Sequence, residues 1–127
     1  MGKFYPDIIG RIGYNLQSLR KDIPDTMKGF SSMASAARKD GVVDKKTKEF
    51  IALAIGVSSH CDGCIGFHTQ ALVKLGVTRQ EFEEVLGTVV YMGGGPSLMY
   101  AADALLAFDQ FTEIQNAPKN EADPADA

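Results

Sequence analysis

The stretch from His60 to His68 reads His-Cys-Asp-Gly-Cys-Ile-Gly-Phe-His, and it holds both cysteines and both histidines of the 127-residue chain. On an α-helix, Cys61, Cys64 and His68 fall at positions i, i+3 and i+7, so two thiols and an imidazole line one face over about two turns. The remaining chain reads as helices that hold this stretch in place. The spacing therefore predicts a redox-active thiol pair with a basic group beside it.

The reactivity expected of the two thiols depends on their place in a helix. A cysteine reacts as its thiolate, and its pKa falls at a helix N-terminus or beside a basic group. We expect Cys61 and Cys64 in the first turn of a helix, with His68 near Cys64. One turn apart, the two sulfurs can also close a disulfide after one of them has been oxidised.

The length and composition of the chain indicate one soluble domain. A chain of 127 residues can bury a core that needs no disulfide, and its 45% hydrophobic and 23% charged residues are ordinary for a globular protein. No signal peptide and no membrane-spanning run is evident, so we expect a cytoplasmic protein. In a reducing compartment, a Cys-x-x-Cys pair is typical of catalysis, redox sensing or metal binding.

The charge pattern excludes one class of partner. The net charge is −3, and no dense basic patch is present, so nucleic acid is not an expected partner. Residues 117–127 carry acidic side chains and two prolines without a large apolar residue, which predicts a disordered acidic tail. Residues 1–116 then form a single all-helical domain.

Apolar residues recur at helical spacing throughout the domain and predict an all-α fold of five or six helices. Asp44 can cap one helix, and Thr78 with Glu81 matches a capping box for another. The expected helices span about residues 7–20, 24–39, 44–57, 61–76, 78–92 and 96–114, with the glycines at 93–95 as a break.

The helix expected at 44–57 is nearly apolar all round, so it should be buried. The helix at 24–39 also carries a broad apolar stripe. Helices this apolar leave more hydrophobic surface than one small subunit can cover, which predicts a homo-oligomer.

A single acidic residue, Glu49, lies within the apolar helix, twelve residues before Cys61. A helix, a short break and a second helix can fold back so that this carboxylate faces the first turn of the second helix. There it could orient His68 or relay its proton.

Together, Glu49, Cys61, Cys64 and His68 stand as Glu-x11-Cys-x2-Cys-x3-His. With this pattern the chain resembles, over about residues 30–110, the alkyl hydroperoxidase D-like members of the carboxymuconolactone decarboxylase-like family. The resemblance implies an all-helical bundle that assembles into trimers or hexamers. It also implies a peroxidase or disulfide reductase reaction that is carried by the cysteine pair.

The resemblance assigns different roles to the site residues. Cys64 is the thiol that attacks the peroxide and passes through a sulfenic acid, and Cys61 donates a proton and resolves it as a disulfide. His68 and Glu49 form the proton relay. The reaction needs no metal or cofactor, and a thioredoxin-like or lipoyl-bearing protein is the expected reductant.

The chain also departs from the best-known hydroperoxidase members, which place a histidine between the two cysteines. Here those positions are Asp62 and Gly63, and a histidine stands instead at His60. Family members that decarboxylate the lactone lack the cysteine pair. The thiols therefore argue against decarboxylation.

Other interpretations of the same residues remain open. The cysteines could be buried small hydrophobic residues, or they could bind zinc together with His68 and either His60 or Glu49. Structural zinc sites, however, usually draw on two separated ligand pairs. His60 reads as a loop or capping residue. A redox-sensing or zinc-binding oligomeric module without turnover is the alternative to an enzyme.

Overall fold

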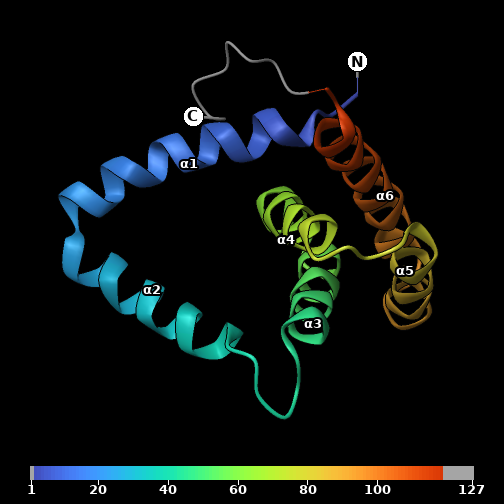
Figure 1. Ribbon diagram of the computed structural model, residues 1–127, viewed down its shortest axis with the longest axis horizontal. Coiled ribbons are helices and arrows are strands. Elements are labelled where there is room, and N and C mark those ends of the chain that lie inside the picture. The colour runs from blue at the N-terminus through green and yellow to red at the C-terminus, as the bar shows by residue number, and fades with distance from the viewer. Residues whose placement is uncertain (1, 119–127) are drawn as a thin grey trace.

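Six α-helices and no strand make up residues 2–118, the part of the chain that this computed structural model describes (Figure 1). They are α1 (Tyr5–Asp22), α2 (Pro24–Arg38), α3 (Lys45–Ser58), α4 (Asp62–Lys74), α5 (Arg79–Gly93) and α6 (Gly95–Asn116). The all-α fold predicted from the helical periodicity is confirmed. The largest difference at the motif is that α4 begins at Asp62, so Cys61 precedes the helix instead of opening it.

Local sequence signals determine where several helices begin and end. The Asp44 carboxylate accepts a hydrogen bond from the Thr47 N–H at the start of α3, at 2.8 Å. The capping box of Thr78 and Glu81 is present at the start of α5, as predicted. The sequence predicted a helix break at the glycines 93–95. In the structure, only Gly94 separates α5 from α6, and its φ of 76° is a left-handed conformation that glycine adopts without strain.

The hydrophobic core lies among α3, α4, α5 and α6, and the first turns of α1 close it. Helix α4 packs against α3, α6 and α1, while α5 packs against α6. The fully buried large side chains are Tyr5, Leu53, Val57, Ile65, Leu72 and Phe82. Because three other helices contact α4, its N-terminal turn is held from several sides.

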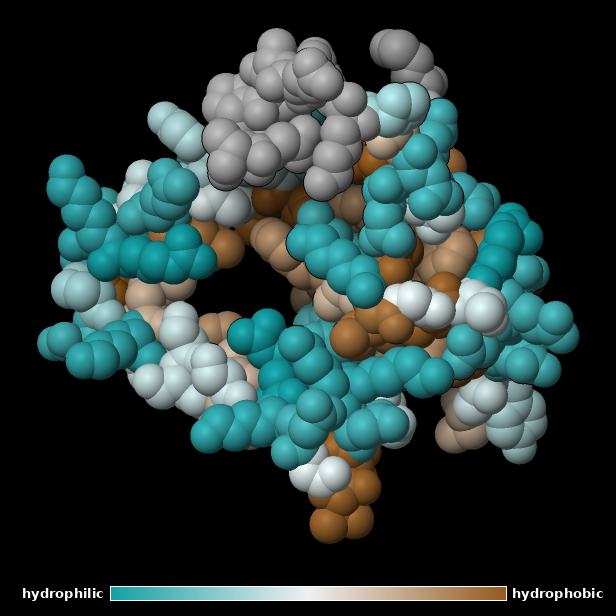
Figure 2. All heavy atoms as spheres, viewed as in Figure 1, coloured by the Kyte–Doolittle hydropathy of each residue, from teal (hydrophilic) through white to brown (hydrophobic). Residues whose placement is uncertain are grey.

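The second half of α1 and all of α2 form an arm that extends away from this core (Figure 1). Helix α2 has no buried residue, and its Phe30 and Met33 side chains are 63% and 62% exposed. Figure 2 shows an opening between the arm and the rest of the molecule, edged in part by apolar side chains. The expectation that α3 is buried all round is wrong for the single chain, because Ile51 and Ile55 lie more than half exposed.

Two further sequence predictions concern membrane-spanning segments and the C-terminal tail. None of the helices between residues 2 and 118 is long and apolar enough to span a membrane. Helix α6 ends at Asn116. Of the tail predicted for residues 117–127, residues 119–127 lie outside the described range.

Candidate redox site

The turn between α3 and α4 places Cys61 at the N-cap of α4. The Cys61 N–H donates to the Gly56 carbonyl at 3.0 Å, which folds the chain back immediately after α3. His60 has a φ of 55°, a left-handed conformation that is uncommon for a residue with a side chain. Cys61 itself is extended, with φ −105° and ψ 97°, as an N-cap residue usually is.

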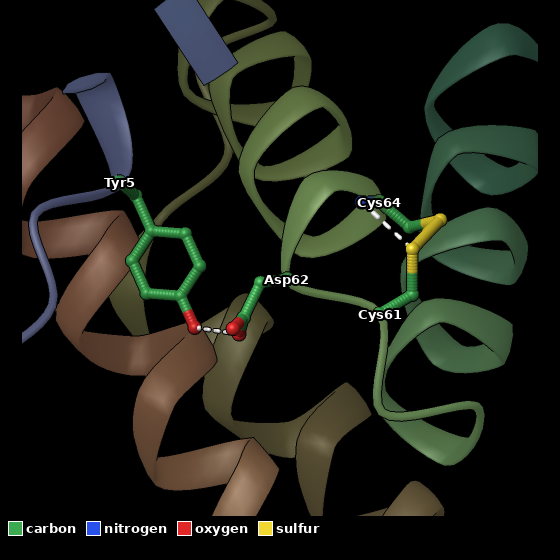
Figure 3. The surroundings of a disulfide bond; sticks show 4 residues. All are labelled: Tyr5, Cys61, Asp62 and Cys64. Atoms are coloured by element: carbon green, nitrogen blue, oxygen red, sulfur yellow. Dashed lines mark hydrogen bonds between the residues drawn. A yellow bond between two sulfur atoms is a disulfide. The ribbon is translucent and has the colours of Figure 1, made fainter. Parts of the chain in front are cut away.

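Cys61 and Cys64 are joined by a disulfide bond, with their Cα atoms 5.3 Å apart (Figure 3). The Cys61 Sγ also accepts a hydrogen bond from the Cys64 N–H at 3.1 Å, so the sulfur caps the helix. Both cysteines are half-buried. A sulfur at this position meets the positive end of the helix dipole, which favours the thiolate once the bond is reduced.

Glu49 and His68 form the other half of the site. The Glu49 Oε2 lies 2.6 Å from the His68 Nδ1, although the two residues are 19 positions apart in the sequence. The Glu49 side chain is 3% exposed and that of His68 is 28% exposed. A buried carboxylate needs such a partner. When Nδ1–H donates to Glu49, Nε2 is the nitrogen that can accept a proton.

The packing of α3 on α4 brings the two halves together. An ideal Cβ atom added at Gly56 would lie 2.9 Å from the Cys64 Cβ, so only a glycine lets the helices approach this closely. Gly56 follows Glu49 by two turns on α3, and His68 follows Cys64 by one turn on α4. The antiparallel helices therefore place Gly56 opposite Cys64 and Glu49 opposite His68.

His60, the other candidate histidine, lies on a different side of the turn. It is exposed, and its ring stacks on that of Tyr100 in α6, with centroids 4.5 Å apart and an interplanar angle of 7°. The structure therefore joins Glu49 and His68 directly and places His60 against α6.

The structure adds a group of side chains that the sequence interpretation missed. Lys3, Tyr5 and Asp103 converge with Asp62, the residue that follows Cys61. The Tyr5 hydroxyl donates to the Asp62 Oδ1 at 2.8 Å, and the Lys3 Nζ lies 3.0 Å from the same oxygen. Lys3 also contacts the Asp103 Oδ2 at 2.8 Å. No local spacing in the sequence indicates these contacts, because they join residues that are 57 or more positions apart.

The protonation behaviour of this group follows from its contacts. Burial, together with the hydrogen bond to Asp62, raises the pKa of Tyr5, so its phenol stays protonated and acts as a donor. The hydrogen bond to Asp103 and that to Asp62 raise the pKa of Lys3, so the ammonium stays charged. Lys3 therefore supplies a permanent positive charge beside the Asp62 carboxylate.

The zinc interpretation requires at least three ligands within reach of one point. Within residues 2–118, no three Cys, His, Asp or Glu side chains come together in an arrangement that could hold a metal ion. The two cysteines are instead bonded to each other. This arrangement suits dithiol–disulfide chemistry.

This chain is similar to known proteins both in sequence and in the arrangement of its helices. Residues 24–107 match the sequence profile described as the carboxymuconolactone decarboxylase family. A crystal structure of a carboxymuconolactone decarboxylase family protein from Legionella pneumophila, in its apo form, has a TM-score of 0.83 and 58% sequence identity to this chain. The comparison covers 85% of this chain and 96% of that one.

Two bacterial relatives also match in sequence. An uncharacterized protein of Cupriavidus necator is 42% identical over 86 residues, which cover 68% of this chain and 76% of the relative. An uncharacterized protein encoded in the cox locus of Paracoccus denitrificans is 28% identical over 81 residues, which cover 64% of this chain and 73% of the relative.

Proposed function

The chain belongs to the carboxymuconolactone decarboxylase family, as an alkyl hydroperoxidase D-like member, and we propose that it is a thiol-dependent peroxidase or disulfide reductase. The observation that carries this proposal is the Cys61–Cys64 disulfide at the start of α4, one helical turn from the paired His68 and Glu49. A thiol pair, a base and a carboxylate that orients the base are the groups that peroxide reduction needs.

The first proposed step is the attack of Cys64 on a hydroperoxide. The Cys64 thiolate forms a bond to the terminal peroxide oxygen, the O–O bond breaks, and the alkoxide leaves as the alcohol after taking a proton. Cys64 is then a sulfenic acid. The Cys61 thiolate attacks the Cys64 Sγ, which releases the hydroxyl group as water and forms the disulfide. Two thiols and one hydroperoxide thus give one disulfide, one alcohol and one water.

His68 and Glu49 move the protons in this scheme. The His68 Nε2 takes the proton from the Cys64 thiol and returns it to the leaving alkoxide. Glu49 holds the imidazole by Nδ1, which fixes the tautomer and stabilises the positive charge while His68 is protonated. Its burial keeps water from competing for that hydrogen bond.

An external dithiol must complete the cycle. A thioredoxin-like or lipoyl-bearing protein is the proposed reductant, because each supplies two thiols that can reduce a disulfide by exchange. The half-buried cysteines lie close enough to the surface for such an exchange. A reducing cytoplasm is the proposed location, since it keeps such a partner reduced.

The decisive experiment follows the loss of two thiols per subunit when an alkyl hydroperoxide is added to the reduced protein. Wild type should lose both thiols and give no lasting sulfenic acid. Cys61→Ser should stop at a sulfenic acid that a dimedone probe traps. Cys64→Ser should form neither the sulfenic acid nor the disulfide at the rate of the wild type. Full peroxide turnover by Cys64→Ser would disprove the assignment.

The alternative of a zinc-binding or redox-sensing module makes a different prediction. Protein purified under reducing conditions without chelator would then hold one zinc per subunit, and removing the metal would unfold it. Metal analysis of the reduced protein separates this module from the proposed enzyme, which keeps its fold and its turnover without metal.

We also propose that the chain acts as a homotrimer or homohexamer. A compact 13.7 kDa monomer exposes about 6600 Å², whereas this chain exposes 8551 Å². In a standard interface, one partner buries on the order of 800 Å². The exposed apolar side chains of α2 and α3 supply a surface of the required kind.

A further inference from the structure

Asp62, the first of the two residues between the cysteines, is bound to the N-terminal segment of the chain. The Asp62 Oδ1 accepts hydrogen bonds from the Tyr5 hydroxyl at 2.8 Å and from the Lys3 ammonium at 3.0 Å. Figure 3 shows that the Asp62 side chain points to Tyr5, on the side away from the disulfide. This segment lies before residues 24–107, the part that the family profile matches.

The segment is itself fixed to α6, so it can hold Asp62 firmly. The Gln110 side chain accepts a hydrogen bond from the Tyr5 N–H at 2.9 Å and donates one to the Lys3 carbonyl at 2.9 Å. Lys3 also pairs with Asp103 of α6 at 2.8 Å. The Tyr5 ring is fully buried. Residues 3–5 thus connect α6 to the first turn of α4.

The same group is also linked, through Tyr100, to His60 on the other side of Cys61. The Lys3 Nζ lies 4.9 Å from the centre of the Tyr100 ring, and His60 stacks on that ring. Both chain neighbours of Cys61, His60 and Asp62, are therefore held by side chains outside the motif. Of the charged and titratable groups described here, Lys3 and Tyr5 contact Asp62 directly. Asp103 and Tyr100 are linked to Asp62 through Lys3, and His60 is linked through Tyr100.

The position and charge of Asp62 matter because a thiolate forms next to it. A carboxylate close to a thiol raises the pKa of that thiol, since two like charges repel each other. The helix N-terminus acts in the opposite direction and favours the thiolate. The Asp62 carboxylate lies in the first turn of α4, but it is turned away from the sulfurs and paired with a lysine. Its repulsion of the thiolate is therefore reduced.

We propose that Lys3 and Tyr5 are positioning residues that act through Asp62 and set the thiol–disulfide equilibrium of Cys61 and Cys64 toward the dithiol. By orienting and neutralising the carboxylate, they make the thiolate more stable and the disulfide easier to reduce. This inference deepens the proposed function, but its readout is the equilibrium of the cysteine pair and needs no peroxide. The inference can therefore fail while the proposed function holds, and the proposed function can fail while the inference holds.

The test is equilibration of the full-length protein with mixtures of reduced and oxidised dithiothreitol at neutral pH. In this exchange, the protein disulfide gains two electrons and two protons, and one dithiothreitol loses them to form its cyclic disulfide. Lys3→Met should shift the equilibrium constant by about threefold to tenfold toward the protein disulfide, which corresponds to about 14 to 30 mV. Tyr5→Phe, which keeps the buried ring, should shift it in the same direction by a smaller factor.

Removal of the Asp62 carboxylate itself should shift the equilibrium constant in the opposite direction. Asp62→Asn should shift the constant toward the dithiol, and the double variant Lys3→Met/Asp62→Asn should show little of the Lys3 effect, because the lysine would act through a carboxylate that is gone. Lys46→Met is the matched control, since it breaks a surface ion pair with Glu81 at 2.8 Å that is separate from this group.

A structural role alone would give a different pattern. If Lys3 and Tyr5 merely stabilised the fold, their variants and Asp62→Asn would lower the free energy of unfolding and leave the redox constant unchanged, or all would shift it with the same sign. Either outcome would overturn the proposal. The pH dependence of thiolate absorbance gives a second readout, in which Lys3→Met should raise the apparent pKa of the reactive thiol and Asp62→Asn should lower it.

Discussion

At the scale of single residues, the feature with most chemical consequence is the buried pairing of Glu49 with His68. An ionised carboxylate that is 3% exposed would be costly without a strong partner, and the 2.6 Å contact with the imidazole supplies one. The same contact determines which imidazole nitrogen can accept a proton. One hydrogen bond thus gives the buried carboxylate a partner and orients His68, the proposed base.

Replacing Glu49 with glutamine should impair the reaction more than the fold. The amide fills nearly the same volume but cannot stabilise a protonated His68, so the rate of peroxide-dependent disulfide formation should fall on the order of a hundredfold at neutral pH. Stopped-flow measurement of thiol oxidation would test this. Glu83→Gln is the control, because Glu83 is an exposed partner of Arg79. A wild-type rate for Glu49→Gln would rule out the relay role.

Sequence spacing predicted the Glu49–His68 pair but not the group around Asp62. Glu49, the cysteines and His68 lie on two consecutive helices, so a helix, a turn and a helix are enough to bring them together. Lys3 meets Asp62 across 59 positions, and no periodic pattern records such a contact. Asp62 reads in the sequence as an acidic residue in a first helical turn, which is common enough to need no partner.

At the scale of elements, the close approach of α3 and α4 controls the geometry of the site. Gly56 and Cys64 face each other with no room for another atom, and Glu49 meets His68 further along the same two helices. The spacing between the helices therefore affects both the disulfide and the contact between Glu49 and His68. A change at one point of this contact should move both.

The substitution Gly56→Ala should show this coupling. The added Cβ would lie 2.9 Å from that of Cys64, so the helices must separate, and the free energy of unfolding should fall by about 1 to 3 kcal/mol. Urea denaturation would measure the loss. Gly10→Ala is the control, because Gly10 lies within α1 with nothing near its added Cβ. That variant should gain about 0.5 to 1 kcal/mol. Equal effects from the two variants would contradict the packing argument.

The sequence predicted where helices begin better than it predicted which helix faces are buried, and the reason is physical. The caps at Asp44 and Thr78 depend on hydrogen bonds within a few residues, so they are legible in the sequence. The burial of a helix face depends on what covers it. The apolar stripe of α2 predicts a partner surface, yet the single chain leaves that stripe open.

At the scale of the whole molecule, the arm formed by the second half of α1 and by α2 is the feature that packs least against the rest of the subunit. It borders an opening that the other described residues leave unfilled in the view of Figure 2. Its apolar side chains, with those of α3, would face water in a monomer at a free-energy cost that grows with their area. Contact with further copies of the chain would remove this cost.

A charge placed on the arm should disrupt the proposed assembly. Phe30→Glu would put a carboxylate on the apolar stripe of α2, and the mass measured by light scattering should fall from that of an oligomer toward that of one 13.7 kDa subunit. Lys28→Glu is the control, because position 28 lies on the opposite face of the same helix and its variant should keep the wild-type mass. A wild-type protein that is a stable monomer would disprove the assembly.

The contact between Glu49 and His68 spans 19 positions, whereas Lys3 reaches Asp62 across 59. The proposed reactive groups thus lie in one helical hairpin, whose low contact order favours early formation during folding. The contacts that we propose adjust the redox balance form when residues 3–5 dock on α6. Such a hairpin is a portable unit: grafted onto another helical scaffold, it would carry its chemistry with it, and the new scaffold would decide how readily its disulfide is reduced.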